Sequence, residues 1–335
     1  MPITTHNKTQ LTRGYAVALA SAAVLSTTAI FIRHLTQTYQ MPPLVLAFWR
    51  DIFVVLTMLL ALRRLKPEWL RLERRHLPFF AGYGLVLAGF NTLWTFSVAF
   101  NGAASSTVLA YTSAGFTALL GWWLLKERLD WVKILVIAVS LGGCALVADA
   151  FDPAAWRINL AGILTGMSSG LFYALYSLMG RTASQRGLNP WTSLIYTFGF
   201  AAGFLLCFNL VGPGTLATKV AQFAWLGTRL PGWGILFLLA AGPTVIGFGL
   251  YNTSLSYLPS SVANLIVTLE PAFTAVMATV LLGERISAMQ IGGGLMIMGS
   301  VAFLRLYEEQ RAKSSAASPD IAAVQEVCPA LSLPE

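Results

Sequence analysis

The most constraining feature of the sequence is a series of apolar segments of about 20 residues, separated by short polar links. Such a segment spans the roughly 30 Å hydrocarbon core of a bilayer as one α-helix. The short links leave no room for a domain outside the membrane. We therefore predict an all-α polytopic membrane protein with ten transmembrane helices, at residues 14–35, 43–62, 77–100, 103–125, 131–149, 159–180, 190–210, 233–254, 259–282 and 287–306.

The composition excludes several other classes of protein. Only 11% of the residues are charged, whereas soluble domains carry roughly 25%. The apolar runs lack the alternation of polarity that marks β-barrel strands. The net charge of +8 is explained by basic loops on one side of a membrane, and no nucleic-acid-binding motif is present. The three cysteines do not have the spacing of a metal site, so we expect no metal, no cofactor and no nucleic-acid partner.

The basic residues predict how the chain is threaded through the membrane. Lys and Arg concentrate on the cytoplasmic side of membrane proteins. With a cytoplasmic N-terminus, only Arg33, Arg50, Arg157, Lys219, Arg229 and Arg285 of the 22 Lys and Arg residues fall outside. We therefore expect a multi-pass protein of the cell inner (plasma) membrane with both termini in the cytoplasm. Residues 1–13 form the N-terminal tail, and residues 307–335, rich in small polar residues, form a disordered C-terminal tail.

The chain also contains an internal repeat. At one constant offset, Phe116-Thr117-Ala118 aligns with Phe273-Thr274-Ala275, and Leu124-Leu125-Lys126-Glu127-Arg128 aligns with Leu281-Leu282-Gly283-Glu284-Arg285. We predict two related halves of five spans each, residues 14–149 and 159–306. Because five is odd, the second half crosses the membrane upside down relative to the first. Inverted repeats are characteristic of secondary transporters, in which similar halves exchange conformations around a midplane site.

Several motifs, taken in order, resemble the EamA-type members of the drug/metabolite transporter superfamily. They are Ala47-Phe48-Trp49-Arg50 in the second span, Leu269-Glu270-Pro271 in the ninth, and the Glu-Arg endings of the fourth and ninth. The resemblance covers about residues 14–306 and implies export of amino acids, other metabolites or drugs without ATP. The chain departs from the family pattern at Lys126, where the family has Gly, and at Leu25-Ser26, where many members have Trp-Gly.

Ionisable groups inside a bilayer are costly and are therefore functional candidates. Glu270 lies midway along the ninth span, before Pro271, which removes a backbone donor and can bend the helix. It is a candidate site for a substrate amine or a proton; the alternative is a structural carboxylate in a broken helix. Arg50 is a candidate at the outer mouth for a substrate carboxylate; the alternative is an interfacial anchor. Asp51 neighbours Arg50 on the helix, so we expect the two not to face one lumen.

Polar and aromatic side chains gather at midplane depth and predict a substrate-binding cavity. Aromatic rings stack on apolar or aromatic solutes, and amides and hydroxyls orient them. For each residue the alternative is an interhelical hydrogen bond without substrate contact. Together with Glu270, the predicted substrate-binding residues are Asn91, Trp94, Tyr111, Tyr173, Tyr176, Tyr196, Asn252, Asn264 and Thr268.

Other residues have expected structural roles. Glu127 and Glu284 end the fourth and ninth spans and are expected to cap the N-terminus of the following span. Pro243 and Pro271 are predicted hinges because proline interrupts the hydrogen bonding of a helix. No nucleophile, acid–base pair or metal-ligand cluster is arranged for catalysis, so we do not expect an enzyme.

These features together predict a secondary transporter that exports small organic metabolites such as amino acids by alternating access. Its expected partners are the small-molecule substrate, the lipid bilayer and, as a candidate coupling ion, the proton. An uptake carrier or drug permease of the same fold, and a solute channel, are the alternatives. The oligomeric state and the choice between proton exchange and facilitated diffusion are left open.

Overall fold

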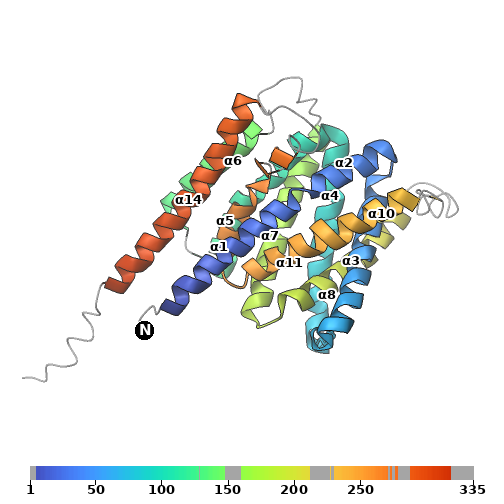
Figure 1. The fold of residues 1–335 in the computed structure, drawn as a ribbon, viewed down its shortest axis with the longest axis horizontal. Coiled ribbons are helices and arrows are strands. Elements are labelled where there is room, and N and C mark those ends of the chain that lie inside the picture. Colours follow the sequence, from blue (N-terminus) through green and yellow to red (C-terminus); the bar gives the residue numbers. More distant parts are fainter. Residues whose placement is uncertain are drawn as a thin grey trace, which may run out of the picture.

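The computed structural model describes residues 5–127, 129–147, 160–211, 227, 230–270, 272–273, 276–277 and 287–317. All regular secondary structure in these residues is helical, and Figure 1 shows the arrangement. The helices are α1 (Thr5–Leu25), α2 (Thr28–Thr38), α3 (Pro43–Leu65), η1 (Pro67–Leu70), η2 (Arg74–His76), α4 (Leu77–Tyr111), α5 (Ser113–Leu125), α6 (Trp131–Val147), α7 (Leu160–Gln185), α8 (Pro190–Leu210), α10 (Leu230–Leu239), η3 (Ala240–Thr244), α11 (Val245–Ser254), α12 (Ser260–Val267) and α14 (Ala288–Ala317).

The helices have the length and surface expected in a bilayer. Large apolar side chains such as Leu60, Trp123 and Leu295 are exposed on the outside of the bundle, where lipid solvates them. Among the described residues, the helical segments long and apolar enough to cross a membrane are Gln10–Thr36, Pro43–Leu65, Arg74–Ser97, Pro190–Leu210 and Leu230–Ser254; shorter apolar helices are Leu109–Leu125, Trp131–Leu146 and Ile291–Leu304. The predicted all-α polytopic fold is confirmed.

Helix α4 contains the third predicted span and the first part of the fourth. It is helical over 35 residues, yet its two arms lie against the same point of α7. A Cβ atom placed on Gly166 would lie 2.8 Å from Ser97 Oγ and 2.7 Å from Leu109 Cβ. A straight helix would separate these two residues by roughly 18 Å along its axis. The chain therefore turns back between Ser97 and Leu109, as two antiparallel spans require.

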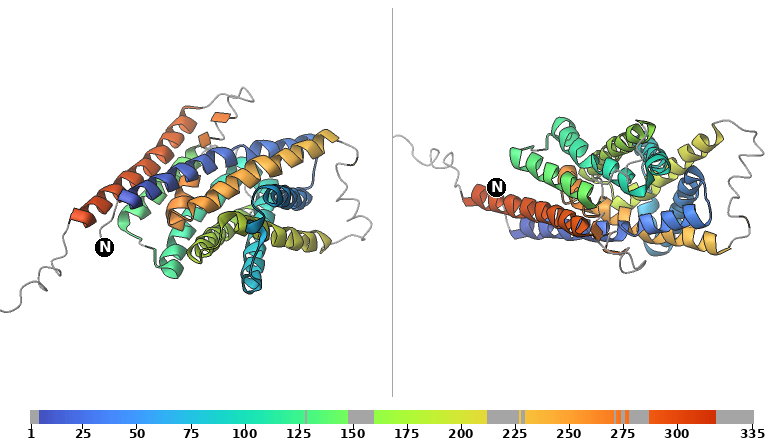
Figure 2. Two further views of the ribbon diagram at one scale, coloured as in Figure 1. Left: turned by 60° about the horizontal axis from the view of Figure 1, so that its bottom comes forward. Right: turned by 90° about the horizontal axis from the view of Figure 1, so that it is seen from above.

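The contacts between the halves come in equivalent pairs. Where a span of the first half packs against a span of the second, the corresponding spans of the opposite halves also pack together. Helix α1, in the first predicted span, packs against α11 in the eighth, and α4, which begins with the third, packs against α7, the sixth. Pairs of equivalent spans also meet, namely α3 with α8, α5 with α12 and α6 with α14. Figures 1 and 2 show α1 and α2 beside α10 and α11, with the two segments running in opposite directions. This exchange of partners is the pattern expected for two inverted copies of one unit.

Four of the predicted spans are interrupted near their middle, and the first of them breaks at Ser26 and Thr27, between α1 and α2. The fourth span breaks at Thr112 and the ninth just after α12, and in each a threonine hydroxyl donates to the carbonyl three residues earlier: Thr112 to Leu109 and Thr268 to Leu265, both at 2.5 Å. In the eighth span, Pro243 lies in a π-helical turn, η3. Broken helices expose backbone carbonyls inside the bundle, which transporters use at their substrate and ion sites.

The C-terminal helix differs from the prediction. A disordered tail was expected from residue 307, but α14 continues to Ala317. The extension contains Glu, Gln, Arg, Ala and Lys, which are strong helix formers, so the helix continues beyond its apolar part. Residues 318–335 lie outside the described part of the chain.

We predict that Gly84→Ala lowers the stability of the protein, whereas Gly82→Ala does not. A methyl group on Gly84 would contact Phe200 Cβ and lie 2.9 Å from the backbone nitrogen of Ala201, whereas on Gly82 its nearest neighbour is Met179 Cε at 3.9 Å. Both substitutions gain the same helix propensity. The difference between the two variants in free energy of unfolding therefore measures the clash of α4 with α8, about 1–3 kcal/mol. Thermal unfolding in detergent measures it, and equal midpoints for the two variants would contradict this packing.

We predict that Lys126→Gly stabilises the protein by about 1 kcal/mol. Lys126 ends α5 in the left-handed conformation, with φ 54° and ψ 32°, which glycine adopts without the steric cost of a Cβ atom. This geometry explains the glycine of the family pattern at the same place. A lower unfolding midpoint for Lys126→Gly than for the parent protein would be inconsistent with this account.

Candidate functional site

The two broken spans meet at Asn264, which joins the halves of the protein. Ser113, the first residue of α5, donates to Asn264 Oδ1 at 3.1 Å. Asn264 Nδ2 donates to Ser177 Oγ of α7 at 3.0 Å. All three side chains are buried. A single amide therefore binds Ser113 of the first half and Ser177 of the second, at the depth where both spans are interrupted.

A cluster of tyrosines surrounds this amide on one side. Asn252 of α11 accepts from the Tyr83 hydroxyl at 3.2 Å and donates to the Tyr176 hydroxyl at 2.8 Å. The Tyr173 and Tyr176 rings are nearly parallel, with an interplanar angle of 8°. The Tyr251 hydroxyl shares a 2.6 Å hydrogen bond with Ser177. The tyrosine cluster, Tyr83, Tyr173, Tyr176 and Tyr251, therefore continues the polar network of Asn264 with a wall of aromatic rings.

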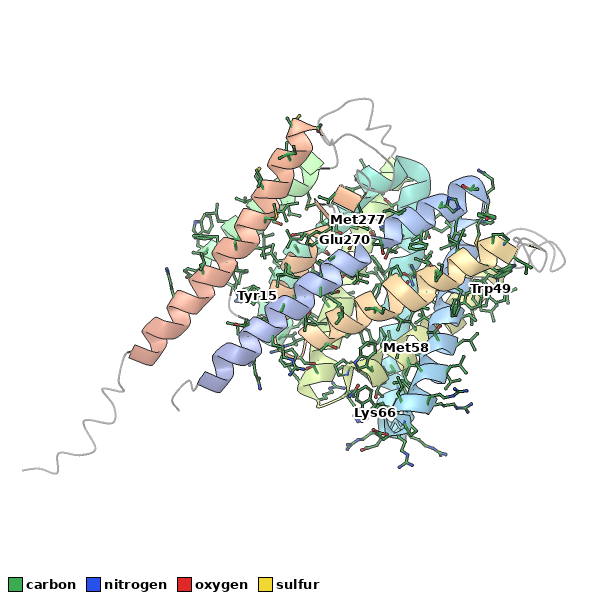
Figure 3. The ribbon with its side chains drawn as sticks, viewed as in Figure 1. Tyr15, Trp49, Met58, Lys66, Glu270 and Met277 are labelled. Carbon is green, nitrogen blue, oxygen red and sulfur yellow. The ribbon has the colours of Figure 1, made fainter. Side chains whose placement is uncertain are left out.

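Glu270 lies next to the break in the ninth span. Its side chain is half-buried and is hydrogen-bonded to the hydroxyl of Tyr111, at the end of α4. Figure 3 shows Glu270 well away from Lys66, which follows the end of α3. The break itself is held by α6, because Ser140 and Thr268 share a 2.7 Å hydrogen bond. Pro271, the predicted hinge after Glu270, lies outside the described residues.

A second buried charge lies in α3. Arg50 Nε and Nη2 donate to Asp51 Oδ1 at 3.2 and 3.1 Å, and Asn91 Nδ2 of α4 donates to Asp51 Oδ2 at 3.1 Å. Both charged side chains are at most 5% exposed. The two side chains, which we expected not to face one lumen, are bonded to each other, because the long arginine side chain bends back over its own helix to reach Asp51.

Glu127 caps the N-terminus of a helix, as predicted, but the capped helix is not the predicted one. Glu127 Oε1 accepts from the backbone N–H and the hydroxyl of Ser260, at 2.8 and 2.7 Å. Glu127 Oε2 accepts from the corresponding groups of Ser261, at 3.3 and 2.7 Å. The carboxylate therefore caps α12 of the other half rather than the span that follows it in sequence. Glu284 lies outside the described residues.

Two of the predicted binding residues lie apart from this network. The Tyr196 hydroxyl donates to the Leu70 carbonyl at 2.9 Å, in the link between α3 and α4. Trp94 is half-buried beside an apolar cluster formed by α2, α3 and α10. The other predicted binding residues, Asn91, Tyr111, Tyr173, Tyr176, Asn252, Asn264, Thr268 and Glu270, each take part in the contacts described above.

Several network residues were missed in the sequence. Tyr83, Tyr251 and Ser177 were not singled out, although Tyr251 adjoins Asn252 and Ser177 follows Tyr176. Their hydrogen-bond partners lie on other helices, and the sequence alone does not show which helices pack together. Within the described residues, no group of three or more His, Cys, Asp and Glu side chains is placed to hold a metal ion.

The chain is similar to proteins named as transporters along most of its length. A family model described as the EamA-like transporter family matches residues 12–148 and 160–306. An "uncharacterized transporter" of Clostridium kluyveri is 24% identical over 86% of this chain and 92% of its own length. A "probable amino-acid metabolite efflux pump" of Salmonella typhimurium is 24% identical over 78% of this chain and 85% of its own length.

A solved structure has the same fold. A chain titled only as the crystal structure of a protein superimposes with a TM-score of 0.71 and 16% sequence identity. The match covers 89% of this chain and 98% of the other. The shared architecture therefore extends through both halves.

We predict that Glu127→Ala destabilises the protein by about 1.5–3 kcal/mol, the range for hydrogen bonds to charged groups. The substitution leaves the N-terminal N–H groups of α12 and two serine hydroxyls without their acceptor. Glu68→Ala is the control, because Glu68 is 56% exposed and lies 3.9 Å from Lys66 in an exposed pair, which contributes little. Equal unfolding midpoints for the two variants would show that the cap does not brace the halves.

Proposed function

Since the chain belongs to the EamA-like transporter family, we propose that it exports small organic metabolites such as amino acids by alternating access of its two halves. The protein is a membrane transporter and not an enzyme. The substrate class is supported by relatives of Salmonella typhimurium and Escherichia coli that are named as probable amino-acid metabolite efflux pumps.

The observation that carries this proposal is the hydrogen-bonded network around Asn264. Its members come from both halves and lie where two spans are broken. Secondary transporters with inverted repeats hold their substrates at such discontinuous helices, near the midplane. A site shared between halves changes shape when the halves move relative to one another, so substrate binding and conformational change are coupled.

The tyrosine cluster supports an organic substrate with an apolar part. Rings of Tyr173 and Tyr176 offer stacking surfaces, and Asn252 and Asn264 offer amides that orient polar groups. Glu270 supplies a carboxylate beside the same network, at which a substrate ammonium or an exchanged proton binds. These groups favour apolar and aromatic amino acids among the candidate metabolites.

The contacts at one end of the bundle fit a closed gate. Glu127 binds Ser260 and Ser261 across the halves, and Arg181 Nη1 donates to the Leu255 carbonyl at 2.6 Å within the second half. The basic-residue distribution predicts that these contacts lie on the cytoplasmic side. In the proposed cycle, the contacts of Glu127 break when the site opens to the cytoplasm and form again when it opens outward.

We predict that purified protein in liposomes exchanges radiolabelled amino acids in counterflow, and that Glu270→Gln lowers this rate at least about tenfold, the loss of one charge-assisted hydrogen bond. The variant is also expected to lose any response to an imposed pH gradient. Glu68→Gln, on the exposed link after α3, is the control.

Two results would contradict the proposal. Solute flux without saturation or counterflow would indicate a channel. An unchanged rate and unchanged pH response in Glu270→Gln would remove the assigned role of that carboxylate while leaving the transporter itself intact.

A further inference from the structure

The Arg50–Asp51 pair is an incomplete ion pair buried in the transporter. An optimal arginine–carboxylate pair uses two parallel bonds to two oxygens, at 2.7–2.9 Å. Here Nε and Nη2 both donate to Oδ1, at 3.2 and 3.1 Å. Both bonds are long, and Oδ2 of Asp51 is bound only by the Asn91 amide, at 3.1 Å, within the described residues. Each of the two charged side chains is therefore bonded to the other while part of its own hydrogen-bonding capacity is unused.

The guanidinium has the larger unused capacity. Arginine carries five N–H donors in a fixed fork, and only Nε and Nη2 are bonded in the part of the chain that the structure describes. Arg50 is only 4% exposed, so bulk water does not satisfy the remaining donors. A buried charge with unmatched donors is destabilising unless another acceptor completes it. A carboxylate is the acceptor that best fits the fork.

The pair also adjoins the site already described. Asp51 lies close enough to Tyr176 for an electrostatic interaction between the two side chains. Tyr176 is bonded to Asn252, and both of these residues belong to the second half. Asn91, which holds Asp51, comes from α4. The two charges thus border the tyrosine cluster rather than an isolated part of α3.

We propose that Arg50 and Asp51 form a receptor for the zwitterionic head group of an α-amino acid. The substrate carboxylate binds the unmatched N–H groups of Arg50, and its ammonium binds Asp51 Oδ2 in place of the Asn91 amide. The side chain of the substrate then lies against the tyrosine cluster. This assignment rests on the proposed function, and it narrows the substrate class to molecules that carry both charges on adjacent groups.

A purely structural ion pair makes a different prediction. Replacing both charges together leaves no unpaired charge, and such replacements are often tolerated by the fold. A structural pair would therefore be lost without a change in substrate preference. A receptor would lose its preference for zwitterions in the same variant, because neither head group would find its partner.

The experiment compares three competitors of amino-acid counterflow in liposomes: phenylalanine, phenethylamine, which lacks the carboxylate, and 3-phenylpropanoate, which lacks the ammonium. In the parent protein, phenylalanine is expected to compete at a concentration at least about tenfold lower than either analogue. Arg50→Gln is expected to abolish the preference over phenethylamine, and Asp51→Asn the preference over 3-phenylpropanoate. The double variant R50Q/D51N is expected to fold and to lose both preferences.

The swapped variant R50D/D51R separates the two roles further. It restores an ion pair between the same positions, so a structural role would be rescued, whereas a receptor with its charges exchanged would not recover the zwitterion preference. Arg64→Gln, at an exposed residue, is the control for a lost positive charge.

The outcomes distinguish this inference from the proposed function. The receptor would be overturned, and the transporter left in place, if amino-acid counterflow is observed and R50Q/D51N keeps the full zwitterion preference. A recovered preference in R50D/D51R would have the same meaning. Equal competition by phenylalanine and phenethylamine in the parent protein would also overturn it. No amino-acid counterflow in the parent protein would overturn the proposed function and the receptor with it.

Discussion

The structure depends on the requirement that polar groups within a bilayer find partners inside the protein. The broken fourth and ninth spans create such a demand at the centre of the bundle, and Asn264 meets it by binding Ser113 from one half and Ser177 from the other. Each hydrogen bond between membrane helices contributes only a modest free energy. The main effect of these bonds here is therefore to fix the geometry of the helices. They hold the two interrupted helices together at the place where a solute can bind.

The same demand explains why each half also stabilises the other. Glu127 ends a helix of the first half and caps α12 of the second. Helices α1 and α7, which begin the two halves, each pack against a helix of the opposite half. Other strong contacts lie within one half, such as those of Tyr176 with Asn252 and of Asp51 with Asn91. Movement of one half against the other therefore exchanges interfacial contacts and leaves each half intact, as alternating access requires.

The sequence predicted the all-α fold and the family because spans of about 20 apolar residues and the aligned Glu127 and Glu284 are long or repeated signals. It predicted less of the site, because the partners of a side chain depend on packing between distant segments. Nothing near Glu127 indicates that its partner is Ser260, more than a hundred residues away. The Arg50–Asp51 contact was missed because helix periodicity places Cβ atoms and not the end of a long side chain.

The most direct test of this account is the sidedness of two equivalent links, after α3 and after α8. Glu68 and Val211 are exposed in these links, and each is replaced by cysteine in a chain whose Cys144, Cys207 and Cys328 have been changed to serine. An impermeant maleimide is applied to intact cells and to inverted vesicles. Two oppositely threaded halves predict that Glu68→Cys reacts only from the cytoplasmic side and Val211→Cys only from the outer side. Reaction of both from the same side would contradict the inverted arrangement on which the shared site depends.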